Sequence, residues 1–143
     1  MTDKLRDALM RDEGFRAQPY TDSTGHVSIG YGRNLDAKGI SRAEAAFMLE
    51  HDITEARADV AANLPWAETL GDARHAVLVN MAFNLGIGVL GQSGLLAFVK
   101  MLAACERGDY DRAAAEMMDS TWAKQVGPRA HRLARQMQLG EWV

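Results

Sequence analysis

Apolar and polar residues recur along the chain with two different periods, which predict one short β-segment and helices elsewhere. In residues 2–12, Leu5 and Leu9 lie four positions apart, as on one face of a helix, and Thr2 is a suitable N-cap. Gly14 ends this pattern. The first predicted element is therefore a short helix that finishes close to Glu13.

The segment that follows predicts a β-element. Pro19 excludes a continuing helix, and the sequence DSTG is typical of a turn. Residues 26–31 alternate, so that Val27 and Ile29 share one face of a strand and Ser28 occupies the other. We expect the Val27 face to pack inward and the Ser28 face to point the opposite way.

Beyond residue 40 the pattern is helical. Ser41 and Glu44 have the spacing of a capping box at the start of a long helix, which Pro65 ends. Residues 72–85 are apolar on nearly every face, which predicts a buried central helix capped by Asp72. The other boundaries that we expect are caps at Ser93 and Asp109, stops at Gly108 and Gly140, and Pro128 in the first turn of the last helix.

These elements predict an α+β, mostly helical fold within a single domain. Residues 1–40 would form an N-terminal α/β lobe with a small β-hairpin. Residues 41–64 would form a long linking helix, and residues 65–143 an all-helical lobe.

Composition and charge narrow the functional classes. A net charge of −3 argues against a nucleic-acid binder, including a helix-turn-helix protein. No apolar run approaches the roughly 18 residues of a membrane span, and residues 1–14 are too charged for a signal peptide, so we expect cytoplasmic synthesis and no membrane insertion. Cys105 is the lone cysteine and the four histidines show no ligand spacing, so we expect no metal and no cofactor.

Two carboxyl groups near the predicted turn are candidates for catalysis. Glu13 lies at the C-terminal end of a helix, where the helix dipole disfavours a negative charge and suits a general acid. Asp22, at a turn rich in backbone donors, is expected to stay ionised, and Ser28 could hold a water beside it. Such a pair is the arrangement of an inverting glycosidase. A capped helix followed by a solvated turn is the structural alternative.

The spacing E-x8-D-x5-S across Glu13, Asp22 and Ser28, followed by IGYGRNL, resembles the glycoside hydrolase family 24 endolysins, the family of the T-even phage lysozymes. The segments GISRAEAAFMLEHDI, LVNMAFNLG and STWAKQVGPRAHRLARQMQLGEW extend the likeness over nearly the whole chain. The loop between Arg33 and Gly39 is short, as in the lambdoid phage members. Ser28 stands where the family usually has threonine, so the hydroxyl is kept.

The resemblance implies a lysozyme-like two-lobed fold and hydrolysis of the β-1,4 bond between N-acetylmuramic acid and N-acetylglucosamine in peptidoglycan. It implies Glu13 as general acid, Asp22 as the carboxylate that activates a water or stabilises the transition state, and Ser28 as the residue that orients the water. The substrate-binding residues that it implies are Asn34, Phe83, Asn84 and Arg129, the last also as a partner of the Glu13 region.

The same resemblance implies a monomeric phage or prophage endolysin whose partners are peptidoglycan glycan strands. From the host cytoplasm it would reach the wall in the periplasm through a holin-dependent lesion. Two alternatives stay open. A lytic transglycosylase would use the same acid without water and leave an anhydro sugar, and a virion protein would bind the wall without catalysis.

Overall fold

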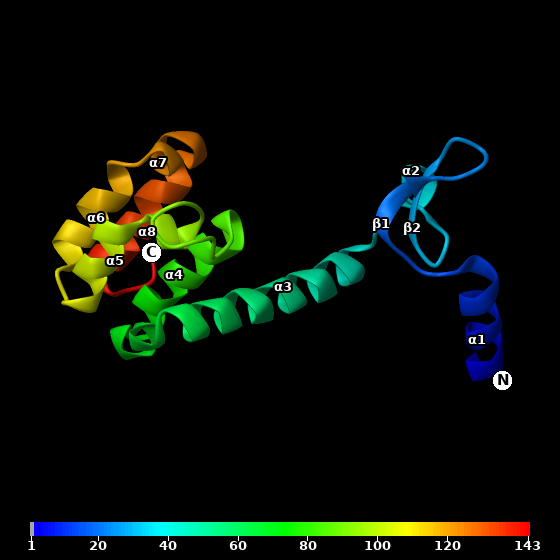
Figure 1. Cartoon of the computed structure of the whole chain (residues 1–143), viewed down its shortest axis with the longest axis horizontal. Helices are drawn as coiled ribbons and strands as arrows, with labels where there is room; N and C mark the ends of the chain where they lie inside the picture. The colour runs from blue at the N-terminus through cyan, green and yellow to red at the C-terminus, as the bar shows by residue number, and fades with distance from the viewer. Residues whose placement is uncertain (1) are drawn as a thin grey trace. The chain divides into compact units, whose positions relative to one another are not determined.

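The computed structural model describes residues 2–143 and divides the chain into two compact units. The N-terminal unit ends at Met48, and the C-terminal unit runs from Leu49 to Val143. The boundary falls within the long helix α3, Arg42–Asn63 (Figure 1). The cap expected of the Thr2 side chain lies outside the described side chains.

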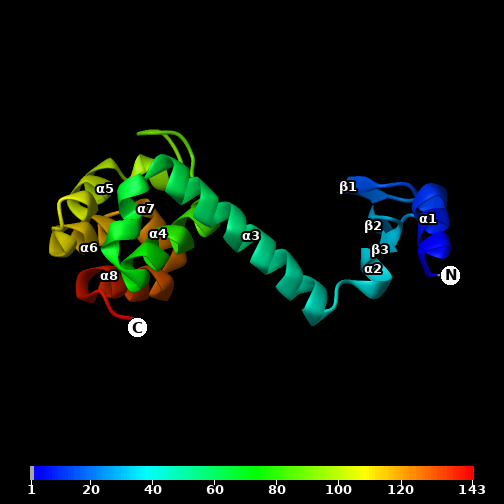
Figure 2. The ribbon, with the colours of Figure 1, turned by 90° about the horizontal axis from the view of Figure 1, so that it is seen from below.

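The N-terminal unit begins with helix α1, Thr2–Glu13, which confirms the first predicted helix. A three-stranded antiparallel sheet in the order β1-β2-β3 follows (Figure 2). Its elements, with the single helical turn after them, are β1 (Arg16–Thr21), β2 (Val27–Gly30), β3 (Arg33–Asn34) and α2 (Leu35–Lys38).

The register of the sheet places Ser28 at its centre. Ser28 pairs with Tyr20 of β1 on one side and with Asn34 of β3 on the other. The pairing of β1 is irregular between Arg16 and Tyr20, the stretch that contains Pro19. Proline is tolerated there because β1 is an edge strand and its ladder is already interrupted.

The predicted inward and outward faces of β2 are wrong. Ser28 is the buried residue of the strand, with 3% of its surface exposed, whereas Val27 and Ile29 are half-buried and Tyr31 is 46% exposed. The reason is the size and place of the serine. It is a small side chain on the middle strand, with a paired strand on each side.

The C-terminal unit is helical beyond Leu49 and is built around α4. Its elements after α3 are η1 (Pro65–Leu70), α4 (Asp72–Leu85), η2 (Leu95–Ala97), α5 (Val99–Glu106), α6 (Tyr110–Met118), α7 (Thr121–Val126) and α8 (Pro128–Leu139). The predicted burial of α4 is confirmed, since Val77, Leu78 and Met81 are fully enclosed. Ala56 and Val60 of α3 join the same hydrophobic core.

The predicted helix boundaries are confirmed where the capping residue and its partner lie within a few positions of each other. The capping box is present, because the Ser41 amide donates to Glu44 Oε1 at 3.0 Å and the Glu44 amide donates to Ser41 Oγ at 3.1 Å. Asp109 caps α6, and Gly140 ends α8 in the left-handed conformation.

Two predicted caps are wrong. Asp72 is the first residue of α4, and Gly71 occupies the cap position without a side-chain hydrogen bond. Ser93 precedes a short 3-10 turn, and its hydroxyl instead accepts from the amide of Val89 at 3.1 Å. In both places the helix begins directly after a glycine with positive φ, Gly71 before α4 and Gly94 before η2.

Within residues 2–143, no helix combines the length and the apolar character that a membrane span requires.

Candidate active site

Glu13 ends α1 and points its carboxyl group at the backbone of the β2–β3 turn. A Cβ atom placed on Gly32 would lie 2.5 Å from Oε2 of Glu13 and 3.0 Å from its Cδ. Gly32 also has a positive φ of 74°, which glycine adopts without strain. The turn therefore has two reasons to carry glycine, and one of them is the space that the Glu13 carboxyl occupies. Glu13 itself is exposed.

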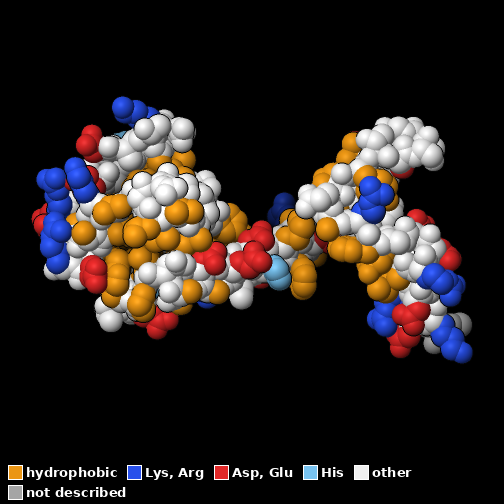
Figure 3. All heavy atoms as spheres, viewed as in Figure 1, with side chains coloured by type: hydrophobic (Ala, Val, Ile, Leu, Met, Phe, Trp, Pro, Cys, Tyr) orange, Lys and Arg blue, Asp and Glu red, His pale blue; other side chains and the backbone are white. Residues whose placement is uncertain are grey.

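Asp22 lies at the start of the β1–β2 turn, where neighbouring donors surround one of its oxygens. Oδ1 accepts from the Thr24 amide at 2.9 Å, from the Thr24 hydroxyl at 2.7 Å and from the His26 amide at 2.9 Å. The tip of this hairpin is mostly white in Figure 3, since Ser, Thr and Gly at positions 23–25 belong to neither the charged nor the hydrophobic class. Asp22 is thus fixed by its own turn.

These donors set the charge of Asp22. The hydroxyl of Thr24, followed by the amide of His26, holds the pKa of the Asp22 carboxyl below its usual value. Hydrogen bonds to a carboxylate favour its charged form. The expectation that Asp22 stays ionised therefore agrees with its surroundings.

Strand pairing brings Ser28 and Asn34 together, and each residue also has a place in the local structure. Ser28 is buried at the centre of the sheet. Oδ1 of Asn34 accepts from the Ala37 amide at 3.0 Å and so caps the turn α2. Among the described residues, no hydrogen bond joins Glu13, Asp22 and Ser28 to one another.

The remaining substrate-binding candidates lie in the C-terminal unit. Asn84 is exposed at the end of α4, and its Oδ1 accepts from the indole nitrogen of Trp122 at 2.8 Å. Phe83 is 43% exposed, so it is not a core residue. Arg129 donates from Nε and from NH2 to Oδ1 of Asn80, at 3.0 and 2.7 Å.

A cavity of about 740 Å³ in the C-terminal unit is lined by two of these candidates, Phe83 and Arg129, and by Asn80, the partner of Arg129. Apolar residues of α3 and α4 also line it. The expected pairing of Arg129 with the Glu13 region stays a prediction, because the two residues belong to different units.

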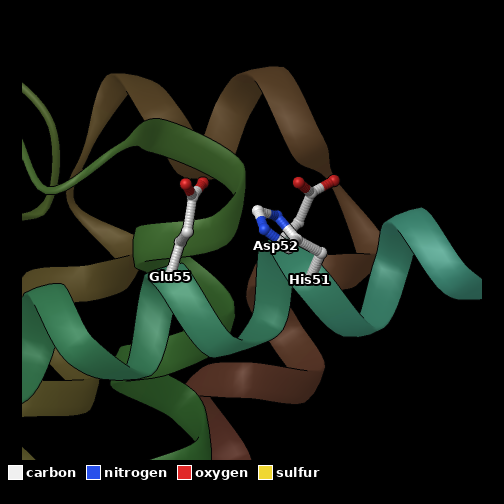
Figure 4. Close-up of side chains that lie close together, drawn as sticks. All are labelled: His51, Asp52 and Glu55. Atoms are coloured by element: carbon white, nitrogen blue, oxygen red, sulfur yellow. The ribbon is translucent and has the colours of Figure 1, made fainter.

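His51 lies close to two carboxylates, although the spacing of the four histidines in the sequence did not predict a metal site. Atoms of His51, Asp52 and Glu55 that could bind a metal all lie within 4.8 Å of one another on α3 (Figure 4). All three side chains are exposed and lie within five residues of one helix, at positions 51, 52 and 55. Exposed acidic groups often cluster in this way, so the cluster alone does not define a metal site.

Cys105 is a core residue, as expected. It is fully enclosed, and burial raises the pKa of its thiol to about 12. A thiol of this kind is not nucleophilic at neutral pH.

Sequence reasoning missed two parts of the site. Thr24 holds Asp22, and the spacing of Asp22 and Thr24 within DSTG is the local signal that could have found it. Glu13 and Gly32, which are in contact, lie far apart in the sequence, so no local pattern predicts this contact.

Comparisons with known proteins agree with this picture. The model of the family described as phage lysozyme matches residues 10–138. Two proteins of Dictyostelium discoideum, Probable T4-type lysozyme 1 and 2, are each 26% identical over 98% of this chain and 96% of their own length. The pre-baseplate central spike protein Gp5 of Enterobacteria phage T4 is 27% identical over 90% of this chain, which spans 26% of that protein.

The matches extend over both units, from the end of α1 to the end of α8. They support a lysozyme-like glycoside hydrolase function, with peptidoglycan as the substrate that such a family implies. The chain belongs to the phage lysozyme family.

Proposed function

We propose that this protein hydrolyses the β-1,4 bond between N-acetylmuramic acid and N-acetylglucosamine in bacterial peptidoglycan. The observation that carries the proposal is the contrast between two carboxyl groups of the N-terminal unit. Asp22 is held as a carboxylate by Thr24 and His26, whereas Glu13 stands at a helix C-terminus and rests on the backbone of Gly32. Carboxyl groups in unlike environments can serve as acid and base in one reaction.

Glu13 is the general acid in this proposal. It transfers its proton to the glycosidic oxygen as the bond to the anomeric carbon breaks, and the leaving sugar departs with a new hydroxyl group. Its place at the end of α1, with the carboxyl group against the backbone of Gly32, supports a role in which the position of the proton donor is fixed.

Asp22 activates the attacking water or stabilises the positive charge that develops on the sugar. In the first case it takes one proton from the water, and the resulting hydroxide bonds to the anomeric carbon with inversion. Ser28 orients this water with its hydroxyl, which can both donate and accept. Its fixed place on the middle strand supports a role in which position matters.

Residues of both units would bind the glycan strand. Phe83 offers an exposed aromatic ring at the cavity of the C-terminal unit, and Asn84 is held in one orientation by Trp122. Arg129 supplies a positive charge that no carboxylate of the described residues neutralises, and Asn34 lies beside Ser28. No metal or cofactor takes part in the proposed reaction.

In the cell, the proposed role is host lysis by a monomeric endolysin. The protein would be made in the host cytoplasm and would act in the periplasm after a holin permeabilises the membrane. Co-expression with and without a holin, followed by measurement of turbidity, tests this route. Lysis that needs the holin is the expected result, and lysis at the same rate without it would contradict the route.

A second role is favoured by one comparison. The match to the central spike protein covers 90% of this chain, so a similar sequence also forms part of a protein named for the phage baseplate. The corresponding alternative here is a virion protein that binds the wall without cleaving it. Intact carboxyl groups at positions 13 and 22 weigh against loss of catalysis.

Mass spectrometry of the fragments released from purified Gram-negative sacculi separates these roles. Hydrolysis yields fragments with reducing N-acetylmuramic acid ends. Fragments lighter by one water at that sugar would indicate a lytic transglycosylase. Binding to sacculi without any release would indicate the non-catalytic role.

A further inference from the structure

Arg33 joins the short strand β3 to the start of α3 within the N-terminal unit. Its NH1 donates to the carbonyl oxygen of Gly39 at 3.0 Å and to Oε1 of Glu44 at 3.2 Å, while its NH2 pairs with Oε2 of Glu44. A guanidinium group that contacts both oxygens of a carboxylate fixes the orientation as well as the distance of the pair. We call this contact the Arg33–Glu44 clamp.

Glu44 is itself held from a second side. The amide of Ser41 donates to Oε1 of Glu44 in the capping box of α3. Arg33, and after it Ser41, lowers the pKa of Glu44 to about 2, so the carboxylate stays charged at neutral and mildly acidic pH. The clamp is therefore anchored to the first turn of a long helix.

The other end of the clamp lies next to the candidate acid. Gly32, the residue before Arg33, is the one on whose backbone the Glu13 carboxyl rests. A shift of the Arg33 backbone would move this surface. The strand pairs Ile29 with Arg33 and Ser28 with Asn34, so the same shift would also move the partner of Ser28.

Strand pairing alone holds this segment weakly. β3 contains only Arg33 and Asn34, and a two-residue strand has few ladder hydrogen bonds to resist displacement. The Arg33 side chain adds three hydrogen bonds at that point, two to Glu44 in the clamp and one to the carbonyl oxygen of Gly39.

We propose that Arg33, held by Glu44, is a positioning residue for the general acid. It fixes the Gly32 backbone on which the Glu13 carboxyl lies, and it touches neither the substrate nor the reacting atoms. The inference rests on the proposed role of Glu13.

Variants of the clamp test the inference with one matched control. Glu44→Gln removes the ion pair but keeps an acceptor for the Ser41 amide, because glutamine also serves in a capping box. Arg33→Lys keeps the charge but loses the two-pronged contact. Ser41→Ala is the control, since it weakens the cap and leaves Arg33 and Glu44 intact.

The readouts are kcat and KM on defined peptidoglycan fragments and the thermal unfolding midpoint of each variant. We expect Glu44→Gln and Arg33→Lys each to lower kcat by roughly 10-fold at unchanged KM, because a small displacement of a catalytic group is costly. The double variant should be no worse than Arg33→Lys alone, since that change already removes the paired contact with Glu44. Ser41→Ala should lower only the unfolding midpoint.

A second pair of variants examines the contact between Gly32 and Glu13 directly. Gly32→Ala and Gly30→Ala impose the same backbone strain, with φ values of 74° and 68°, but only the Cβ at position 32 would meet Glu13, and the one at position 30 meets nothing within 4 Å. We expect a larger loss of kcat for Gly32→Ala. Wild-type kcat in Glu44→Gln and Arg33→Lys would overturn the positioning role. If Glu13→Gln is inactive in the same assay, that result would leave the proposed function standing.

Discussion

The hydroxyl of Thr24 donates a hydrogen bond of 2.7 Å to Oδ1 of Asp22. The same oxygen of Thr24 lies 2.7 Å from Nδ1 of His26, so it accepts there when it donates to Asp22. Thr24, two residues after Asp22 in the same turn, thus orients the Asp22 carboxylate and favours its charged form.

Thr24→Val keeps the shape of the side chain and removes this hydrogen bond. The bond to Thr24 is the first cause that lowers the pKa of Asp22, so the pKa rises in the variant. Since Asp22 acts as a carboxylate, activity should then be lost at a higher pH on the acid side of the profile of kcat/KM against pH. Thr21→Val is the control, because Thr21 is an exposed threonine next to Asp22 whose hydroxyl makes no hydrogen bond to that carboxylate among the described residues. Coincident acid limbs for Thr24→Val and wild type would contradict this role of Thr24.

Ser28 is predicted to orient the water, and its burial changes what substitution should do. Ser28→Ala should lose activity by roughly 10-fold or more, because the water loses a partner and is less well placed. Ser28→Thr should keep the activity, since it keeps the hydroxyl. The added methyl group must fit a site with 3% exposure, so we expect a cost of about 1 kcal/mol in the free energy of unfolding. Activity assays and urea unfolding of both variants measure the two effects, and full activity in Ser28→Ala would remove Ser28 from the mechanism.

The ion pair between Arg33 and Glu44 should make part of the stability depend on pH. The pKa of Glu44 falls from 4.5 to about 2 on folding, so its contribution is fully present above pH 4.5 and is lost as the pH falls through about 2. Glu44→Gln has no group to titrate there. Urea unfolding at successive pH values should therefore show wild type and variant converging as the pH falls over that range, and a constant difference would argue against the pair as its source.

Phe83 is expected to contact the sugar. Phe83→Ala should raise KM and lower the free energy of unfolding by less than the roughly 3 kcal/mol that removing a fully buried phenylalanine costs, because the ring is 43% exposed. Phe47→Ala provides a comparison, since Phe47 is 76% exposed and is not among the residues that line the cavity. A large loss of stability with unchanged KM in Phe83→Ala would make the ring a packing residue.

Much of the fold follows from local patterns in the sequence. The capping box of Ser41 and Glu44, the cap at Asp109 and the stop at Gly140 depend on residues within a few positions of one another, and all three are confirmed. The same reasoning failed at Asp72, where the preceding glycine decides the helix start.

The site shows a similar division. Spacing and family resemblance nominate Glu13, Asp22 and Ser28, and the local turn explains why Asp22 is ionised. The burial of Ser28 could not be predicted, because strict alternation does not reveal which strand lies in the middle of a sheet. The partner of Arg33 lies 11 residues away, and only the folded chain brings Glu44 to it.

Replacement of Glu13 by glutamine tests the central claim most directly, because it removes the proton and keeps the size of the side chain. Asp12→Asn is the matched control, since it makes the same change of charge at the adjacent exposed carboxylate. Release of fragments from purified sacculi should fall at least roughly 100-fold in Glu13→Gln, while the unfolding midpoint and sacculus binding stay at wild-type values and Asp12→Asn remains fully active. Release by Glu13→Gln at more than about a tenth of the wild-type rate would contradict the assignment of Glu13 as the general acid.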